Sequence, residues 1–394
     1  MSEAPNSMNN RINSSDPSAP LAGITVIELG ASVAGPFAGQ TLGDLGAEVI
    51  KIEKPDGDDA RQWGPPFVDG AAALFQALNR NKRSVVCDLR DGATIARLTE
   101  FIVTHADVVV QNMRPGQVDE LQLGAAALRA KKPALIYCNM GAFGRVGPLA
   151  KRPGYDPLMQ AFGGVMSTTG EAGRAPVRVG PSMMDMGTAM WAVIGIVSAL
   201  YRRRATGEGA VIDVSLFETA ATWMNMYSAQ FLASGILPGR NGSGQTGLAP
   251  YRAFATTDGD VVIAAGSDAL YRKLCIALAH PEWIDDARFA SNPARVANVQ
   301  ALNALIDALI RTQSSAHWID VLDRAGVPCA PIQNVKQLLE HEQLHGLGML
   351  QAVPGASIPF MGLPVSFDGQ RATPRSASPA LGADTETILS RSTP

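Results

Sequence analysis

The segment LAGITVIELGASVAGPFAGQTLGDLGAEVIKIEKP, residues 21–55, decides the fold of this chain. Its run 24–29 (ITVIEL) is apolar and β-branched, which predicts a strand, and 30–35 (GASVAG) is typical of a turn. A helix should follow over about 36–45, because the proline that opens it lacks the N–H that a first helical turn leaves unpaired. Residues 47–52 (AEVIKI) predict a second strand. This order indicates two parallel strands joined by a right-handed crossover.

The same alternation continues along the first half of the chain. Further strands are expected at 84–89, 108–111 and 134–139, with helical stretches between them. Strands that alternate with helices predict an α/β domain built on a parallel, Rossmann-like sheet. The longest helix should span 186–204, because three arginines suit its carboxyl end and Gly207 suits a left-handed stop.

A second, smaller α+β domain is expected after the loop 238–247 (PGRNGSGQTG). It should open with a hairpin from Tyr251 that turns at 257–260 and continue with helices. The expected organisation is a disordered tail at 1–20, the large domain at 21–205, a linker at 206–224, the small domain at 225–330, and a linker that returns to the large domain at 331–394.

Composition excludes several classes of protein. The 394 residues carry 33 Lys+Arg and 36 Asp+Glu, a net charge of −3, which argues against a nucleic-acid binder. The four cysteines are far apart, which predicts reduced thiols in the cytoplasm. No secretory signal opens the chain, and the longest apolar run, 186–201, is too short and too rich in small residues for a membrane span.

Common cofactor motifs are missing from the sequence. The turn 30–35 is not G-x-G-x-x-G, which disfavours a dinucleotide, and no Walker, HExxH, GxSxG or zinc-ligand pattern occurs. The five histidines lie in polar or helical contexts that suit solvated side chains. We therefore expect no metal and no tightly bound cofactor.

Asp185 is the most informative carboxylate. It lies among methionines at the start of the long helix, so it can cap that helix as an N-cap residue. It can also act as a nucleophile, because a helix start favours the ionised carboxylate while apolar neighbours remove its water. Asp156, in the sequence GYDP, is expected only to form a turn or cap. Two basic segments, 81–84 (NKRS) and 112–116 (NMRPG), are expected as turns beside strand ends, where open α/β sheets bind phosphorylated ligands.

The chain resembles the class III CoA-transferases, a family that includes the α-methylacyl-CoA racemases. The resemblance covers nearly everything from Leu21 onward. It rests on the opening segment, NKRS, NMRPG, GYDPLMQAFGGVMSTTG, the Asp185 segment, TGEGAVIDVSLFE, NGSGQTG, GVPCAPI and PALGADTETIL.

The resemblance implies covalent catalysis with CoA as substrate and product. The family's nucleophilic aspartate falls on Asp185, which would form first an acyl anhydride and then an aspartyl-CoA thioester. The implied donor is succinyl-CoA or another short dicarboxylic acyl-CoA, and the acceptor is a carboxylic acid. The implied CoA contacts are Val33, Ala34, Lys54, Arg90, Asn112, Met113, Arg114 and Phe143. The implied substrate and oxyanion loop comprises Tyr155, Gly242, Ser243 and Gly244.

The sequence departs from the family at two of these positions. Val33 stands where the formyl-CoA enzyme carries glutamine, and Glu120 stands where that enzyme has a phosphate-binding arginine. Lys54 and Arg90 are expected to face phosphates, and Arg114 is a candidate substitute for the arginine that Glu120 replaces.

Two functions remain open within the family. The alternative is racemase-type proton transfer, but racemases carry a histidine where this chain has Tyr155, a much weaker acid. Arg178, shortly before Asp185, is a candidate partner for the second carboxylate of a dicarboxylate, and a surface role suits it equally well. The resemblance also implies an interlocked, ring-like homodimer, with no nucleic-acid or membrane partner.

Overall fold

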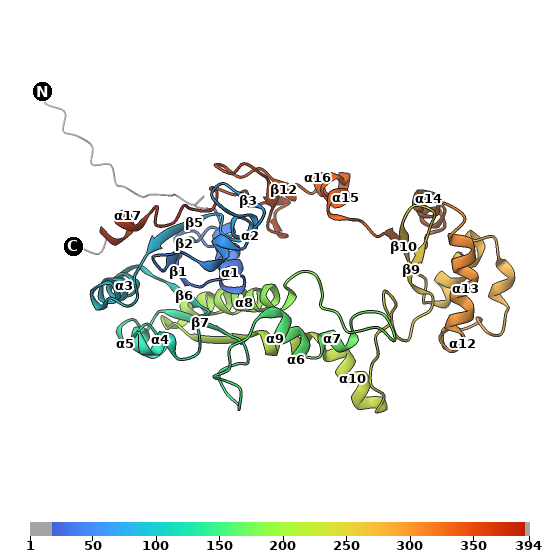
Figure 1. The fold of residues 1–394 in the computed structure, drawn as a ribbon, viewed down its shortest axis with the longest axis horizontal. Coiled ribbons are helices and arrows are strands. Elements are labelled where there is room, and N and C mark those ends of the chain that lie inside the picture. The colour runs from blue at the N-terminus through green and yellow to red at the C-terminus, as the bar shows by residue number, and fades with distance from the viewer. Residues whose placement is uncertain (1–17, 391–394) are drawn as a thin grey trace, which may run out of the picture. The chain divides into compact units, whose positions relative to one another are not determined.

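The computed structural model describes residues 18–390 (Figure 1). The tail expected at 1–20 lies outside the described residues, apart from 18–20. The chain divides into two compact units. The first unit contains the described residues up to Gly163, the segment Gly180–Asn225, and the described residues from Glu342 onward. The second unit contains Gly164–Val179 and Met226–His341.

A six-stranded parallel sheet forms the centre of the first unit, as the sequence predicts. Its strands are β1 (Thr25–Leu29), β2 (Glu48–Glu53), β5 (Lys82–Val86), β6 (Val108–Gln111), β7 (Ile136–Gly141) and β8 (Val211–Ser215). They lie in the order β5-β2-β1-β6-β7-β8, with Val26 opposite Val49 on one side and Val108 on the other. The order reverses between β1 and β6. In open α/β sheets, ligands bind at the carboxyl ends of the strands at such a reversal.

Helices cover both faces of this sheet. Val26 points toward α1 (Ala34–Asp44) and α8 (Met183–Thr206), and the next residue, Ile27, points to the opposite face. That opposite face packs against α3 (Gly92–His105), α5 (Ala125–Lys131) and α17 (Thr385–Leu389). Because successive side chains of a strand point to opposite faces, a sheet buried on both faces requires continuous apolar runs such as 24–29.

Short elements complete the first unit. They are η1 (Asp59–Gln62), β3 (Phe67–Val68), β4 (Ala71–Ala72), α2 (Ala73–Leu78), α4 (Gln117–Glu120), α6 (Asp156–Phe162), α9 (Leu216–Trp223), α16 (Glu342–Gly346), β12 (Leu350–Gln351), β13 (Phe360–Met361), β14 (Ser366–Phe367) and β15 (Gln370–Arg371).

The second unit is a small α+β structure with its own core. Its three-stranded antiparallel sheet has the order β11-β10-β9, and its core includes Phe254, Ile263, Leu302 and Trp318. The elements are α7 (Val165–Thr168), α10 (Asn225–Ser234), β9 (Tyr251–Ala255), β10 (Asp260–Ala264), α11 (Asp268–Ala277), η2 (Pro281–Ile284), α12 (Asn292–Ala297), α13 (Val299–Ile310), α14 (Ser315–Ala325), β11 (Cys329–Pro331) and α15 (Val335–Glu340). The hairpin expected from Tyr251 is therefore present as β9 and β10.

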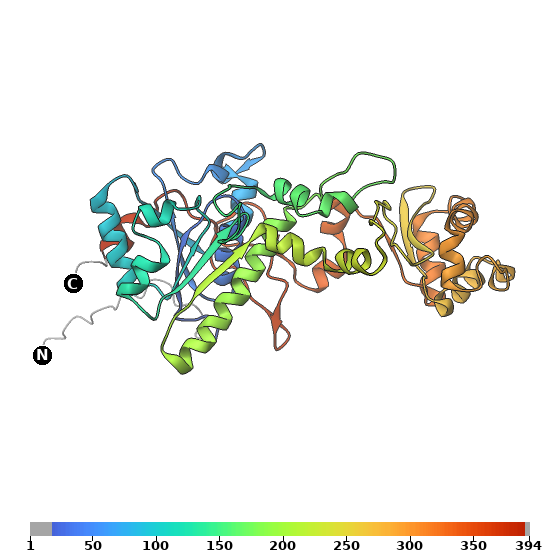
Figure 2. The same cartoon turned by 90° about the horizontal axis from the view of Figure 1, so that it is seen from below.

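Helix α8 is the longest element, and Figure 2 shows it lying along the sheet. By length and composition it is the one helix among residues 18–390 that could cross a membrane, although half of its most apolar window is buried. It packs on α1, β7 and β8, the position of a core helix. The predicted left-handed stop at Gly207 is confirmed, with φ of 72°.

Three expectations need correction. Residues 206–224 are not a linker, since β8 completes the main sheet and α9 follows it, with the Ser215 side chain accepting a hydrogen bond from the Glu218 N–H. The strand expected at 84–89 is β5, Lys82–Val86, and the NKRS segment is not a basic turn at a ligand site. Lys82 is buried and forms an ion pair with Glu28. This opposite charge makes a buried lysine compatible with the interior of a strand.

Candidate active site

The turn that follows β1 lies at the point where the strand order reverses. Its Ala31 N–H donates to Asn112 Oδ1 over 2.9 Å, and Asn112 Nδ2 donates back to the Ala31 carbonyl oxygen over 2.8 Å. On the other side, the Ser32 N–H donates to Asp58 Oδ1 over 3.2 Å. A Cβ on Gly35 would lie 3.0 Å from Gly30 Cα and 3.2 Å from Asn112 Cγ, which is tighter than an ordinary contact, so glycine favours this close approach. The turn is therefore held between the segments that follow β6 and β2.

Helix α1 begins at this turn. Val33 is its N-cap residue, no side chain caps the helix there, and both Val33 and Ala34 line a cavity. A helix start carries unpaired N–H groups and a partial positive charge, so this wall of the cavity suits an oxyanion. The Val33 side chain has no hydrogen-bond donor, so only backbone N–H groups can donate to an oxyanion at this helix start.

Asp185 lies in the same cavity. It is in the first turn of α8, which begins at Met183 rather than at the expected 186, and Ser182 is the N-cap residue. Asp185 is therefore not the N-cap. The other residues that line this cavity include Trp63, Leu74, Asn112, Met140, Tyr155, Asp156 and Ser182. Trp63 and Leu74 were not identified from the sequence, since an isolated apolar residue in a loop or helix carries no positional signal.

The environment of Asp185 favours the neutral carboxyl group, although a helix start alone would favour the ionised carboxylate. Burial raises the pKa of the Asp185 carboxyl to about 7, and the nearby Asp156 carboxylate adds to the shift. Burial therefore outweighs the effect of the helix start. A carboxylate stripped of water is a stronger nucleophile once it loses its proton.

Asp156 supplies the cap that Asp185 does not. Its Oδ2 accepts from the Met184 N–H over 2.7 Å and from the Asp185 N–H over 3.3 Å. Gln160 Nε2 donates to its other oxygen over 2.6 Å, and the side chain is buried. The sequence suggested a turn or cap at Asp156 but could not show that the capped helix is α8, which begins far along the chain.

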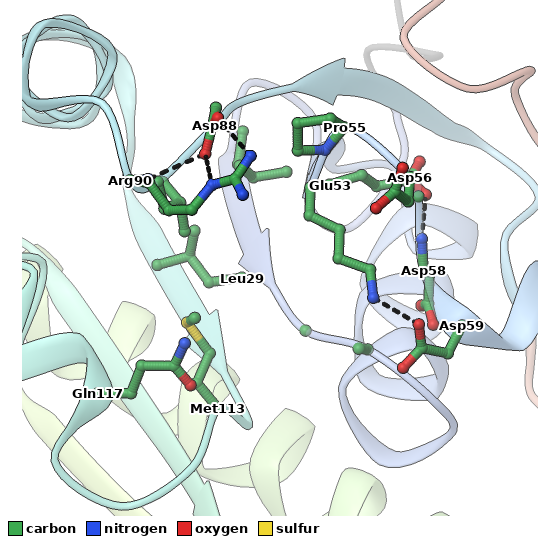
Figure 3. A pocket seen from close by; sticks show the side chains of 16 residues that line it. Leu29, Glu53, Pro55, Asp56, Asp58, Asp59, Asp88, Arg90, Met113 and Gln117 are labelled. Carbon is green, nitrogen blue, oxygen red and sulfur yellow. Dashed lines mark hydrogen bonds and ion pairs between the residues drawn. The ribbon is translucent and has the colours of Figure 1, made fainter.

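A second cavity lies at the carboxyl ends of β1, β2, β5 and β6 (Figure 3). Lys54 and Arg90 both line it, but each already has an anionic partner. Lys54 Nζ lies 2.5 Å from Asp59 Oδ1, and Arg90 binds both oxygens of Asp88 over 2.9 and 2.8 Å. Figure 3 shows the Asp88 and Arg90 pair on one side of the cavity and Asp56, Asp58 and Asp59 on the other. A bound phosphate would have to compete with these carboxylates.

A third cavity joins the other two. It shares Leu29, Ala31 and Lys54 with the second cavity, and Ala31, Ser32, Asn112, Met113, Arg114 and Tyr155 with the cavity of Asp185. Glu120 also lines it. The three cavities share lining residues and therefore adjoin one another, and together they are called the groove. An elongated ligand with a nucleotide at one end and a reactive group at the other fits such a groove.

Phe143 and the glycine loop 242–244 are not among the residues that line these three cavities. Phe143 instead packs against two other aromatic rings. The distance between ring centroids is 5.1 Å to Phe162 and 6.2 Å to Phe217. Gly242, Ser243 and Gly244 belong to the second unit, where the Ala253 N–H donates to Ser243 Oγ over 3.0 Å. Arg178 also belongs to the second unit, in its segment Gly164–Val179.

Comparison with known proteins identifies the class. Residues 21–385 match the family described as CoA-transferase family III, so the chain belongs to this family and is a CoA-transferase. It is 34% identical over 374 residues to a succinyl-CoA:glutarate CoA-transferase of Mus musculus, covering 94% of this chain and 86% of that protein. It is 39% identical over 355 residues to an acetyl-CoA:oxalate CoA-transferase of Acetobacter aceti, covering 90% of each. Both relatives are named transferases, in agreement with Tyr155 in place of a racemase histidine.

A solved structure has the same fold. The CAIB/BAIF family protein from Brucella suis superimposes with a TM-score of 0.86 at 39% sequence identity. The match covers 95% of this chain and 99% of that one. This chain therefore shares its mixed α/β fold with a CAIB/BAIF family protein.

Proposed function

We propose that this enzyme moves CoA from a short dicarboxylic acyl-CoA, with succinyl-CoA as the leading candidate, to a dicarboxylic acid. The observation that supports the proposal is that Asp185 lines one of three adjoining cavities, of which the second lies at the strand ends. The names of both relatives support a dicarboxylic acceptor, since glutarate and oxalate are dicarboxylates, and the name of the Mus musculus relative supports succinyl-CoA as the donor.

The proposed reaction uses Asp185 as a covalent carrier of CoA. The ionised carboxylate attacks the thioester carbonyl of the donor, which forms a mixed anhydride and releases CoA thiolate. The thiolate attacks the aspartyl carbonyl of the anhydride, so the donor acid leaves and an aspartyl-CoA thioester remains. The acceptor carboxylate then attacks this thioester and releases the thiolate again. The thiolate finally attacks the acceptor's acyl carbon, giving the new acyl-CoA and free Asp185.

Each step passes through a tetrahedral oxyanion. The N–H groups of Val33 and Ala34 at the start of α1 are the proposed donors, because they line the cavity of Asp185 and lack a side-chain cap. One such donor typically contributes about 3 kcal/mol to the transition state. We assign Gly242, Ser243 and Gly244 the same task on the basis of the family resemblance.

The groove is proposed to bind CoA with its nucleotide at the second cavity and its thioester at Asp185. Asn112, Met113 and Arg114 would lie beside the pantetheine arm, since they line the connecting cavity. Lys54 and Arg90 would reach phosphates after exchanging their carboxylate partners. Phe143 would contribute only after its aromatic neighbours rearrange.

We also propose that the enzyme works as an interlocked homodimer in the cytoplasm. One face of α8 exposes Met190, Ile194 and Tyr201, which are 56%, 53% and 78% exposed and spaced to share a face. An exposed apolar stripe of this kind is typical of a subunit interface. Light scattering should give twice the mass of 41.4 kDa, whereas a Tyr201→Glu/Ile194→Glu variant should give monomers. A monomeric wild type would contradict the dimer.

An acceptor panel tests the substrate class. Succinyl-CoA is mixed with glutarate, oxalate, mesaconate, butyrate or acetate, and new CoA esters are measured by mass spectrometry. We expect the dicarboxylates to be preferred by about tenfold or more. If Arg178 binds the second carboxylate, Arg178→Ala should raise KM for dicarboxylates and leave KM for monocarboxylates unchanged. Equal preference for mono- and dicarboxylic acids in the wild type would contradict the proposed substrate class.

A further inference from the structure

Four charged side chains are buried together beneath the turn that follows β1. Lys51 Nζ lies 2.9 Å from Glu28 Oε1 and 2.8 Å from Asp58 Oδ2, and Lys82 Nζ lies 2.8 Å from Glu28 Oε2. Their side chains are at most 1% exposed. The cluster holds two positive and two negative groups, so its formal charge is balanced. None of the steps proposed for Asp185 uses these ions.

Three of the four also bind the backbone of the turn or of the first turn of α1. Lys51 Nζ donates to the Gly30 carbonyl oxygen over 2.7 Å, and Lys82 Nζ donates to the Pro36 carbonyl oxygen over 2.8 Å. Asp58 accepts from the Ser32 N–H over 3.2 Å. Ser32 has a φ of 70°, a left-handed conformation that costs a serine energy and needs support from its surroundings. The cluster thus fixes the backbone at both ends and in the middle of 30–36.

The packing around the cluster is adapted to it. A Cβ on Gly39 of α1 would overlap Glu28 Oε2, so the helix approaches this carboxylate closely only because position 39 is glycine. Burial lowers the pKa of Lys82 to about 8 despite the opposing attraction of Glu28. A buried ion cluster is generally no more stabilising than apolar side chains of the same volume. Stability alone therefore does not explain why these four ions meet here, whereas their bonds to the turn do.

We propose that Lys51, Asp58 and Lys82 are positioning residues that hold the turn 30–36 against the cavity of Asp185. Glu28 joins the two lysines, and Lys51 joins Asp58 to them. This inference rests on the proposed function, in which the N–H groups of Val33 and Ala34 bind the oxyanions. Removing one of the hydrogen bonds from the cluster to the turn lets those N–H donors move. A displacement of about 1 Å at a reacting centre can lower the rate by as much as a hundredfold. The cluster lies opposite Asn112, which holds the same turn at Ala31.

The test is the charge-balanced double variant Lys51→Met/Glu28→Gln. It removes the donor to Gly30 without leaving a net buried charge. We expect kcat for CoA exchange to fall about tenfold or more, with a smaller change in KM for succinyl-CoA. Amide hydrogen exchange should become faster in the peptide that contains 30–36. If this variant does not fold, Lys82→Met replaces it, because it removes the donor to Pro36, and the same loss of kcat is expected.

A matched control separates positioning from stability. Arg80 and Asp44 form another buried ion pair of the first unit, at 2.5 Å, with no bond to the turn. The variant Arg80→Met/Asp44→Asn should lose stability but keep kcat within about threefold. Wild-type kcat in the folded Lys51→Met/Glu28→Gln or Lys82→Met variant would overturn the inference, as would an equal loss in the control. A wild type that forms no adduct at Asp185 would instead overturn the proposed function.

Discussion

At the scale of single residues, two carboxyl groups share the start of α8 with different tasks. Asp156 is buried and accepts two backbone N–H groups of the helix, while Asp185 makes no cap and lines the cavity. The burial of Asp185 disfavours ionisation of the nucleophile, and the nearby Asp156 carboxylate adds to this effect. The free enzyme therefore holds a substantial fraction of Asp185 protonated near neutral pH.

This arrangement predicts a pH dependence of kcat/KM. Only the ionised carboxylate attacks the thioester, so with a pKa of about 7 the rate should fall to about half of its high-pH value at pH 7 and to about one tenth of it at pH 6. Asp156→Asn keeps an oxygen acceptor for the Met184 N–H but removes the charge. We expect its acid limb to move to lower pH, measured as kcat/KM for succinyl-CoA from pH 5 to 9. An unmoved acid limb would show that Asp156 does not control the ionisation of Asp185.

At the scale of elements, the end of β2 is tied to η1 by a buried ion pair. Glu53 Oε2 and Oε1 accept from Arg61 Nε and Nη2 over 2.8 and 2.7 Å, and Ser84 Oγ donates to Glu53 over 2.6 Å. Burial by itself would raise the pKa of Glu53, but these bonds outweigh it and lower the pKa to about 2. Ionised Glu53 therefore favours the folded state.

The lowered pKa of Glu53 determines the pH range in which this residue stabilises the folded state. The folded pKa lies below the ordinary value of 4.5, so the stabilisation is complete above about pH 4.5 and is lost as the pH falls toward 2. We expect Glu53→Gln to lower the free energy of unfolding by about 3 kcal/mol at pH 7. The difference from wild type, measured by urea unfolding, should shrink as the pH falls through that window. Glu100→Gln, an exposed residue of α3, serves as the control and should show no such trend. A difference independent of pH would contradict the assignment.

Elements that depend on local sequence patterns can be predicted from the sequence alone. The strand 108–111, the hairpin from Tyr251 and the stop at Gly207 follow local rules of periodicity and turn chemistry, and all three are present. The cap of α8 by Asp156 and the burial of Lys82 depend on contacts between distant segments. Local patterns do not encode such contacts, which explains why the helix start and the NKRS segment were misassigned.

At the scale of the whole molecule, the first unit alone brings Asp185 and the turns after β1 and β6 to adjoining cavities. The turn after β1 and the segment after β6 meet there because the strand order reverses between these two strands. The position of Asp185 at the groove could be inferred only through the family resemblance, since a lone aspartate at a helix start is compatible with a simple cap.

The central claim is that Asp185 carries CoA as a thioester, and intact-mass spectrometry tests it directly. Wild type and Asp185→Ala are each incubated with succinyl-CoA, and the mass of the protein is recorded before and after glutarate is added. We predict a gain of one CoA on the wild type alone, discharged by glutarate with release of glutaryl-CoA. An equal adduct on Asp185→Ala, or CoA exchange at the wild-type rate by Asp185→Ala, would contradict the account.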